Sequence, residues 1–516
     1  MYNGAMAKNV ALKSSARIER RGLFVLLLAC AAVAGCSTRG GTAFQGSVLP
    51  NSTVQDTDRN GKPDVRPTRC PAANASCIQH VVIIIQENRS FNDLFMGFPG
   101  ANTKMSGRAG GSSVPLKALN LEDSKTDISH CWQDAMSAYD YGRMDGFYQE
   151  PPEKLKVSQC PSLRPPIGTG PDSPYTYVPS GAPKYVQEAG PYWNMARQYV
   201  LADHLFPTDF GPSFTAHQDL VASTVEISNK LSIVNYPGTL TRAGGISYSP
   251  GPWSCDSPPG TKTSTVNLKR VVSAGTGPFP CFTQYRTVAD TLDAGHVSWQ
   301  YYTPTQSGYP NGTYLWDPFD AIPSVRYGPD WVNIITPQTK VLAAAENGTL
   351  PGVTWVVPDG VDSDHSGPYA SDRGPSWVAS VVNAVGRGPQ WRSTAIIVLW
   401  DDWGGYYDGM EPPHRDYRGL GIRVAGIIIA PYARKGYVSH TQYEFGSVLK
   451  LVEEVFTIPT LGASGYGYGY TDARSNSLLD GFDFTQIPRK FVTIPAKYPS
   501  STFANEKPSG IPPDNE

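Results

Sequence analysis

The sequence lacks a surplus of charge of either sign, because 43 Lys and Arg residues stand against 45 Asp and Glu residues. Nucleic-acid binding depends on clustered cations that neutralise phosphates, so a near-neutral chain gives no electrostatic case for a nucleic-acid partner. The sequence also lacks a repeat of fixed period, which argues against a solenoid or a propeller. At 516 residues the chain is long enough for one large globular domain.

Long hydrophobic runs are absent as well. The apolar run Leu23–Ala34 holds about 12 residues, whereas a helix that spans a bilayer needs about 20. Arginines occur within residues 17–21 and small residues lead directly into Cys36, so residues 1–36 are expected to be a signal peptide with a lipobox. In this interpretation Cys36 is lipidated, and the protein is an exported lipoprotein of the periplasm or cell envelope, anchored to the membrane. An ordinary signal peptide cleaved nearby is the alternative.

Cysteine is scarce, and of the eight in the chain Cys30 and Cys36 fall in the predicted signal peptide. The other six are an even number in a chain expected to reach an oxidising compartment, so three disulfides are predicted. Six cysteines allow many pairings, and proximity in the sequence favours Cys70–Cys77, Cys131–Cys160 and Cys255–Cys281. None lies in a close cluster with histidine, which makes a structural zinc site the poorer interpretation.

The segment after the predicted signal is polar. Residues 37–76 are expected to be a tether, followed by a large folded domain over 77–495 and a tail over 496–516. Within the tether, residues 56–64 (DTDRNGKPD) have the spacing of oxygen ligands in a calcium loop. Pro67 stands where such a loop has its bidentate glutamate, so a hydrophilic turn is the favoured interpretation and a weak calcium site the alternative.

Short apolar runs rich in β-branched residues predict strands that are buried on both faces. The runs are Val81–Ile85, Val353–Val357, Ala395–Trp400 and Val424–Ala430. Helices are expected between them, for example over Pro375–Val385 and Phe445–Phe456. Strands interleaved with helices predict an α/β sandwich with a largely parallel central sheet, flanked by helices and carrying long loop insertions.

Polar side chains follow three of these runs at the point where each run ends. Glu87 and Asn88 follow the first, His365 comes shortly after the second, and Asp401 and Asp402 follow the third. Ligands of open α/β sheets bind beyond the carboxyl ends of the strands, so these side chains are expected to meet at one edge. Adjacent acids repel each other in a dry site unless a cation compensates, and carboxylate oxygens suit a hard or borderline divalent ion.

A serine stands at the start of another predicted helix. The segment Asp209–His217 reads DFGPSFTAH, in which Ser213 follows a turn. A serine at this position is most often only a helix N-cap, and the segment alone favours that interpretation. A helix N-terminus is also an anion site, and metal coordination would lower the pKa of the Ser213 hydroxyl and make it a nucleophile.

Several segments together resemble one known family. They are IIIQENRSFNDLF (Ile83–Phe95), DISHCW (Asp127–Trp132), GRMDGFY (Gly142–Tyr148), DHLFPTDFGPSFTAH (Asp203–His217), VSWQYY (Val297–Tyr302), SDHSGPY (Ser363–Tyr369) and WDDWGGYYDG (Trp400–Gly409). In these segments the chain is similar to the bacterial phosphoesterase family that contains non-haemolytic-type phospholipases C and an acid phosphatase. The resemblance implies an alkaline-phosphatase-like fold and makes residues 77–495 a phosphoesterase catalytic domain.

The resemblance also implies roles for the residues at the strand ends. Glu87 and Asn88 match a pair that binds metal and phosphate in the family. Ser213 matches the nucleophile that becomes phosphorylated and contacts the metal. Asp401 and Asp402 match acidic metal ligands, in a pairing more typical of the phosphatases.

His130 and His365 match active-site histidines that contact phosphate or protonate the leaving alkoxide. Either histidine by itself would be interpreted as structural. Two departures from the family pattern stand out, because family members commonly carry Asp-His after the QENRSF segment and after the DDWGG segment. This chain has Asn92-Asp93 at the first position and Asp408-Gly409 at the second.

The function expected from the sequence is an exported, metal-dependent phosphoric-ester hydrolase that works through a phosphoserine intermediate. The adjacent acids and the resemblance favour an acid phosphatase acting on phosphomonoesters, and the alternative is a phospholipase C that cleaves phosphodiester headgroups of phospholipids. A lipoprotein that only binds glycans or host protein is a further reading, against which the acids after the strands argue. A metallosulfatase is set aside because the chain lacks the Cys-x-Pro-x-Arg segment that such enzymes modify.

Overall fold

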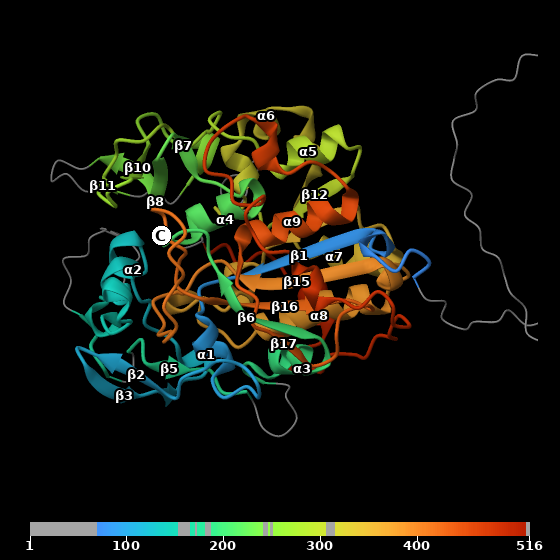
Figure 1. Ribbon diagram of the computed structural model, residues 1–516, viewed down its shortest axis with the longest axis horizontal. Helices are drawn as coiled ribbons and strands as arrows, with labels where there is room; N and C mark the ends of the chain where they lie inside the picture. Colours follow the sequence, from blue (N-terminus) through green and yellow to red (C-terminus); the bar gives the residue numbers. More distant parts are fainter. Residues whose placement is uncertain are drawn as a thin grey trace, which may run out of the picture. The chain divides into compact units, whose positions relative to one another are not determined.

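The four apolar runs predicted as strands are neighbours in one nine-stranded sheet of the computed structural model (Figure 1). The structure describes residues 70–152, 166–170, 173–180, 187–240, 246–247, 251–305 and 315–511. Along the sheet the order is β13 (Ile334–Ile335), β12 (Trp299–Tyr302), β14 (Val353–Val356), β1 (His80–Gln86), β15 (Thr394–Trp400), β16 (Val424–Ile429), β6 (Val200–Phe206) and β17 (Tyr437–Ser439), with β18 (Tyr443–Glu444) also paired to β6.

The strands of this sheet run mostly parallel. β1 pairs in parallel with β14 and with β15, and β12 pairs in parallel with β13 and β14. β16 breaks the pattern, because it pairs antiparallel with both β15 and β6. The predicted α/β fold with a largely parallel central sheet is therefore confirmed, with an antiparallel strand at the run Val424–Ala430.

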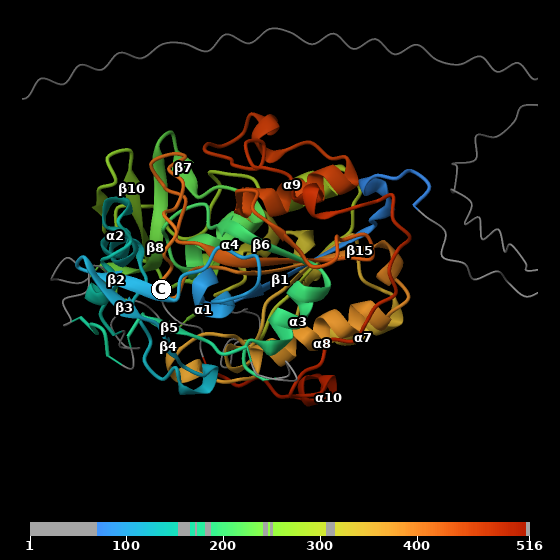
Figure 2. The same cartoon turned by 60° about the horizontal axis from the view of Figure 1, so that its bottom comes forward.

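Helices cover both faces of the sheet (Figure 2). On one face lie α3 (Gly190–Gln198), α7 (Lys340–Asn347), α8 (Gly374–Arg387) and α10 (Ser500–Ala504). On the other face α9 (Phe445–Phe456) packs against α4 (Ser213–Ala222), which also contacts α5 (Val288–Ala294). The two helices predicted from the sequence correspond to α8 and α9. Because both faces are covered, the strand run Val81–Ile85 is fully buried and can be continuously apolar.

The long connections between the central strands carry smaller elements. A second, antiparallel sheet contains β7 (Glu226–Ser228), β8 (Leu231–Leu240), β9 (Ile246–Ser247), β10 (Lys262–Asn267) and β11 (Val272–Ser273). Two smaller pairs are β2 (Ser106–Ala109) with β3 (Ser112–Pro115) and β4 (Lys117–Ala118) with β5 (Thr176–Tyr177). The remaining α-helices of the described chain are α1 (Phe91–Phe95), α2 (Trp132–Tyr139) and α6 (Pro323–Arg326).

Two of the three expected disulfides are formed within the described residues, Cys70–Cys77 and Cys255–Cys281. Cys131 is also disulfide-bonded, and its expected partner Cys160 lies outside the described residues. Disulfides persist in oxidising compartments and are rare in the cytosol of most organisms, so they indicate that the protein works outside the cytoplasm.

The described residues belong to a unit that spans Arg66–Glu516. After residue 495 it includes α10, whose Phe503 ring lies 5.6 Å from the Trp377 ring. The predicted signal peptide, its lipobox, the calcium-loop spacing and nearly all of the tether lie outside the described residues. Within the part of the chain that the structure describes, no helix is both long and apolar enough to span a bilayer.

Candidate active site

The ends of β1 and β15 bring polar side chains to one edge of the central sheet. The two strands pair in parallel with Gln86 opposite Trp400, so the residues that follow each strand are neighbours. The backbone N–H of Asn88 donates to Asp401 Oδ1 at 3.0 Å. The fully buried polar residues that follow the two strands are Glu87, Asn88, Asp401 and Asp402. The parallel register therefore places Glu87 and Asn88 beside Asp401 and Asp402.

Ser213 reaches the same edge from α4. A turn after β6 leads into this helix, and Ser213 is its first residue. The Ser213 Oγ lies 3.3 Å from both Asn88 Oδ1 and Asp402 Oδ2, so its single hydrogen has two acceptors within reach. The N-cap interpretation of this serine is wrong, because Pro212 occupies the N-cap position and no side-chain cap bond forms. The hydroxyl is instead directed at the acid and amide group.

Two histidines flank the Asn88 amide. Nε2 of His130 lies 2.7 Å and Nε2 of His365 lies 2.9 Å from Asn88 Nδ2. The other ring nitrogen of each faces a backbone carbonyl, since His130 Nδ1 lies 2.7 Å from the Ile128 oxygen and His365 Nδ1 lies 3.0 Å from the Ser366 oxygen. A carbonyl only accepts, so each Nδ1 carries a proton. In the neutral form of each ring, Nε2 accepts from the Asn88 amide.

In this arrangement the Asn88 amide oxygen faces other oxygens. Asn88 Oδ1 lies 3.2 Å from Glu87 Oε2 and 3.2 Å from Asp401 Oδ1, and ionised carboxylates cannot donate a hydrogen bond. Reversing the amide would satisfy the acids, but both histidines would then have to donate from both ring nitrogens and be charged. A cation between the oxygens removes the conflict with neutral rings. The donor set of carboxylate, amide and hydroxyl oxygens therefore fits a divalent metal.

His217 belongs to the same group, although the sequence analysis assigned it no role. His217 Nε2 lies 3.0 Å from Glu87 Oε1 and 3.8 Å from Asp401 Oδ2. The three residues form a buried set whose ligand atoms all lie within 4.8 Å of one another. The available signal was the spacing, because Ser213 and His217 are four residues apart and share one face of a helix.

Asp364 holds the loop that carries His365. Its Oδ2 accepts hydrogen bonds from the Tyr192 hydroxyl at 2.8 Å and from Trp400 Nε1 at 2.9 Å. Arg89 Nε donates to the Asp364 backbone oxygen at 2.8 Å. Burial raises the pKa of Asp364 to about 6, against the opposing effect of these two side-chain donors. Through these contacts Asp364 fixes the position of the next residue, His365.

The turn after β15 presses against the backbone of Asn88. Asn88 has a φ of 50°, in the left-handed region that asparagine adopts more readily than most residues. Gly404 has a φ of +59°, and a Cβ at this position would lie 2.1 Å from the Asn88 carbonyl oxygen. The Gly404 N–H also donates to Asp402 Oδ1 at 2.7 Å. A glycine is required here for the turn to support both Asn88 and Asp402.

Asn92, at the first departure from the family pattern, contacts Asp408, which precedes the second departure at Gly409. The backbone N–H of Asn92 donates to Asp408 Oδ2 at 3.1 Å. Asp408 forms a buried ion pair with Arg423 at 3.1 Å, and Asp93 forms one with Arg89 at 3.2 Å. The hydrogen bond from Asn92 to Asp408 therefore joins the segments after β1 and β15, whereas the ion pairs tie Asp408 to Arg423 before β16 and Asp93 to Arg89 within its own segment.

Comparison with known proteins identifies relatives of this chain. Residues 78–459 match the model of the Phosphoesterase family. The non-hemolytic phospholipase C of Pseudomonas aeruginosa is 22% identical over 454 residues, which cover 75% of this chain and 55% of that protein. The hemolytic phospholipase C of the same organism is 23% identical over 486 residues, which cover 84% and 60%. Phospholipase C B of Mycobacterium tuberculosis is 25% identical over 243 residues, which cover 40% and 44%.

The chain spans about half the length of these curated relatives. Among solved structures, a protein in the alkaline phosphatase superfamily from Vibrio parahaemolyticus matches over 73% of this chain and 66% of its own chain. The sequence identity of that match is 9% and the TM-score is 0.30.

Proposed function

The chain belongs to the Phosphoesterase family and is an enzyme of that family, and on this premise we propose that it cleaves phosphodiester bonds of phospholipids as a phospholipase C. The relatives described above are phospholipases C, so they favour this substrate over the phosphomonoester of an acid phosphatase. The observation that carries the proposal is the Ser213 hydroxyl, which lies 3.3 Å from Asp402 Oδ2 and 3.3 Å from Asn88 Oδ1 inside a buried group of acids.

Ser213 is the nucleophile in this proposal. A serine hydroxyl attacks poorly at its ordinary pKa, so a neighbouring group must take its proton or stabilise its oxyanion. Asp402 is in position to accept that proton. The Ser213 Oγ then forms a bond to phosphorus while the bond from phosphorus to the leaving alkoxide breaks. Water attacks the resulting phosphoserine, which releases the phosphorylated headgroup and restores the serine.

A divalent metal completes the proposed site. Its ligands are drawn from Glu87, Asn88, Ser213, His217, Asp401 and Asp402. When bound, the ion supplies positive charge that stabilises the deprotonated serine and the phosphoryl oxygens. A cation bound here would be coordinated by the Asn88 amide oxygen and the neighbouring carboxylates, which otherwise face one another without a donor.

The histidines serve the leaving group. His130 and His365 are protonated at Nδ1 and accept at Nε2 from the Asn88 amide. His130 Nε2 lies 3.7 Å from Asp402 Oδ2, so the proton that Asp402 takes from Ser213 can pass to this nitrogen. The charged ring then no longer accepts from Asn88 and can donate the proton to the departing alkoxide. Before this step Asn88 holds both rings in the group around Ser213, because one amide nitrogen contacts the two Nε2 atoms.

The substrate class is tested with two chromogenic compounds. The purified enzyme is assayed with p-nitrophenylphosphorylcholine, a phosphodiester, and with p-nitrophenyl phosphate, a phosphomonoester. The proposal predicts a kcat/KM for the diester at least about 10-fold above that for the monoester, because a diester site must accommodate a second ester group. A preference for the monoester would overturn the phospholipase C assignment and support an acid phosphatase.

The nucleophile and the metal are tested with the diester assay. Ser213→Ala is expected to lower kcat by about 1,000-fold or more, because no other group can form the covalent bond. Ser380→Ala is the matched control, since Ser380 is buried in α8 and its hydroxyl donates to the backbone oxygen of Ser376 in the same helix. Chelation should abolish activity and a divalent ion should restore it. Full activity of Ser213→Ala would contradict the mechanism and require a different nucleophile.

Cellular location forms part of the proposal. The disulfides at Cys70–Cys77 and Cys255–Cys281 support a protein that works outside the cytoplasm. Lipidation at Cys36 would place the enzyme at a membrane, where phospholipid is available. Metabolic labelling with a fatty acid tests this step, because Cys36→Ser should remove both the label and the membrane association.

A further inference from the structure

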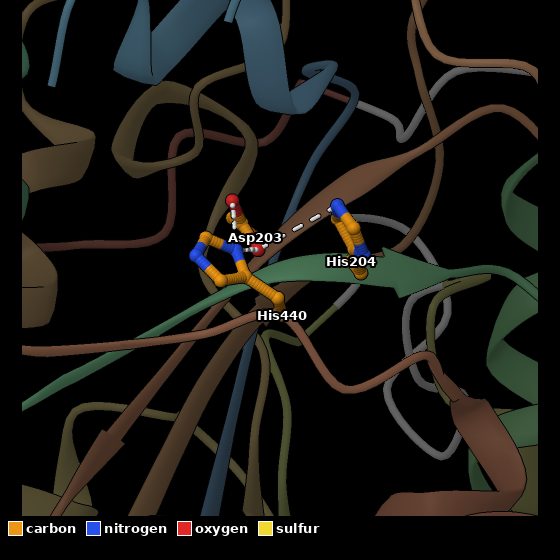
Figure 3. Close-up of side chains that lie close together, drawn as sticks. All are labelled: Asp203, His204 and His440. Carbon is orange, nitrogen blue, oxygen red and sulfur yellow. Dashed lines mark hydrogen bonds and ion pairs between the residues drawn. The ribbon is translucent and has the colours of Figure 1, made fainter. Parts of the chain in front are cut away.

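Asp203, His204 and His440 form a second group of side chains that are able to bind a metal (Figure 3). Asp203 Oδ1 lies 2.9 Å from His440 Nδ1 and 3.8 Å from His204 Nε2. The ligand atoms of the three residues all lie within 4.8 Å of one another. None of them belongs to the group around Ser213. Figure 3 shows the Asp203 carboxylate between the two imidazole rings.

A bulge in β6 explains how two consecutive residues serve one site. In a regular strand neighbouring side chains point to opposite faces of the sheet. The register between β6 and β16 shifts by one residue at this point, so that Asp203 and His204 together oppose Ala425 alone. A bulge of this kind adds one residue to a strand and redirects its side chains. The two ligand side chains can therefore converge.

The other neighbour of β6 is interrupted at the same place. β17 pairs with β6 as far as Ser439, and β18 resumes the pairing at Tyr443. His440 is the first residue of this interruption, so its side chain is free of the strand alternation and lies beside Asp203. The group is thus formed by the bulge between β6 and β16 on one side of β6 and by the gap between β17 and β18 on the other.

An ion pair between Asp203 and His440 does not explain why His204 also lies beside the Asp203 carboxylate. A hydrogen bond between His440 and Asp203 accounts for those two side chains. His204 Nε2, however, is buried and has no hydrogen-bond partner among the described residues. At 3.8 Å from the Asp203 carboxylate it is too far for a hydrogen bond, and it is close enough to share a cation with it.

We propose that Asp203, His204 and His440 bind a zinc ion at a site separate from the catalytic group. Imidazole and carboxylate are ordinary zinc ligands, and three protein ligands leave the fourth position to water. Ligand atoms at about 2.0 Å from a tetrahedral ion lie roughly 3.3 Å apart. The two distances from Asp203 Oδ1, 2.9 Å and 3.8 Å, stand on either side of that value, so small shifts complete the site.

The surrounding charges permit a cation at this position. Arg423 Nη1 donates to the backbone oxygen of Asp203 at 2.8 Å, but its guanidinium is compensated by Asp408 at 3.1 Å. The backbone N–H of Asn102 donates to Asp203 Oδ2 at 2.9 Å and orients the carboxylate. When zinc binds His440 Nδ1, the proton that this nitrogen shares with Asp203 leaves to solvent.

The site is open to solvent on one side. The His440 side chain is 58% exposed and that of His204 is 23% exposed, whereas Asp203 is fully buried. An ion can therefore enter from solvent and still gain a buried carboxylate. Once bound, it links β6 to the connection between β17 and β18, and β6 is the strand that leads toward Ser213.

Zinc stoichiometry tests the proposal on the full-length protein. Wild type, His440→Ala, His204→Ala and His414→Ala are dialysed against micromolar zinc, and bound zinc per chain is measured by elemental analysis. His414 is an exposed histidine outside the group and serves as the matched control. We expect both group variants to bind one zinc fewer than the wild type and than His414→Ala. Equal zinc content in all four proteins would overturn the proposal.

Anomalous diffraction at the zinc edge locates the ion directly. A peak among Asp203, His204 and His440 in wild-type crystals, which disappears in His440→Ala, is the expected result. Absence of this peak from the wild type would refute the site even if zinc is seen elsewhere. Peaks at this group and at Ser213 are separate observations, so the outcome does not depend on the proposed catalytic function.

Discussion

At the scale of the residue, Asn88 joins two parts of the proposed catalytic group that have opposite requirements. Its amide nitrogen donates to two histidines, and its amide oxygen faces two acids and a serine. Only an amide side chain offers a donor and an acceptor at the same branch point. A carboxylate of the same shape would keep an oxygen toward the proposed metal and lose the donor toward the histidines.

Replacing Asn88 by aspartate therefore separates the two tasks. We expect Asn88→Asp to lower kcat by about 100-fold or more, because preorganised polar contacts to the reacting group are lost and a further negative charge is added. Divalent metal should still bind. Steady-state kinetics together with metal titration measure both effects, and wild-type turnover in this variant would show that the amide nitrogen is dispensable.

His217 contributes a nitrogen to a group that is otherwise made of oxygens. Removal of this ring in His217→Ala should weaken divalent metal binding by about 10- to 100-fold, the range typical for the loss of a residue that supports a metal site. Calorimetric titration of the metal-free protein measures the change in Kd. His414→Ala, which alters an exposed histidine, is the control and should bind as the wild type does. An unchanged Kd in His217→Ala would remove His217 from the site.

At the scale of the element, the turn after β15 is expected to tolerate only glycine at position 404. In Gly404→Ala the new Cβ collides with the Asn88 carbonyl oxygen, so Asn88 must move and activity should fall by about 10-fold or more. Gly465→Ala is a close control, because Gly465 has a similar φ of +66° with open space around it. Both variants strain the backbone at a positive φ, but only Gly404→Ala places a Cβ against the Asn88 carbonyl oxygen. Kinetic assays therefore isolate the effect of the collision, and equal activities of the two variants would contradict the expectation.

Helix α9 carries a buried acid that makes stability depend on pH. Burial, with a further contribution from Asp472, raises the pKa of Glu453 to about 9. A glutamate in the unfolded chain loses its proton near pH 4.3. As pH rises from that value toward 9, the unfolded state is increasingly favoured, because it gives up the proton that the folded state keeps.

Glutamine at position 453 cannot titrate and removes this dependence. We expect Glu453→Gln to raise Tm by a few degrees at pH 8 and to leave it almost unchanged at pH 4. Thermal unfolding of both proteins at the two pH values measures the difference, and the measurement at pH 4 serves as the internal control. A Tm difference that is the same at both pH values would contradict a raised pKa.

At the scale of the whole molecule, the two described disulfides close loops of different length. Cys255–Cys281 spans 26 residues and Cys70–Cys77 spans 7. A cross-link that closes a longer loop restricts the unfolded chain more, so removal of the first pair should cost about 3 kcal/mol and of the second about 2 kcal/mol. Urea unfolding of the paired Cys→Ala variants measures both, and the reverse order would contradict the loop-length account.

Four central strands were predictable because they are continuously apolar, and β6, one of those that were missed, shows the limit of that signal. β6 has the sequence VLADHLF, in which Asp203 and His204 interrupt the apolar pattern. The interruption coincides with the bulge, where side chains leave the regular alternation. The second sheet was also missed, because strands such as β10 carry Thr, Ser and Asn rather than a clear apolar run.

The strand-end residues of the site were predictable for a simple geometric reason. Parallel strands end at the same edge, so Glu87 and Asp401 were expected to meet although they are far apart in sequence. His217 was missed because its contact depends on how α4 is oriented over that edge, which no local pattern specifies. The contacts between Asn88 and the two histidines have the same origin, since each histidine lies on an irregular loop.

The place of β1 in the sheet has a consequence for how the protein is made. β1 lies between β14 and β15, and the hydrogen bond from Asn88 to Asp401 joins residues 313 positions apart. A ribosome therefore releases the first strand long before either neighbour exists, and pairings of such sequence separation form slowly. During synthesis the chain carries an apolar strand with unpaired edges, and the proposed catalytic group is not yet assembled. Hydrolytic activity should therefore appear only after the C-terminal half has been translated and folded.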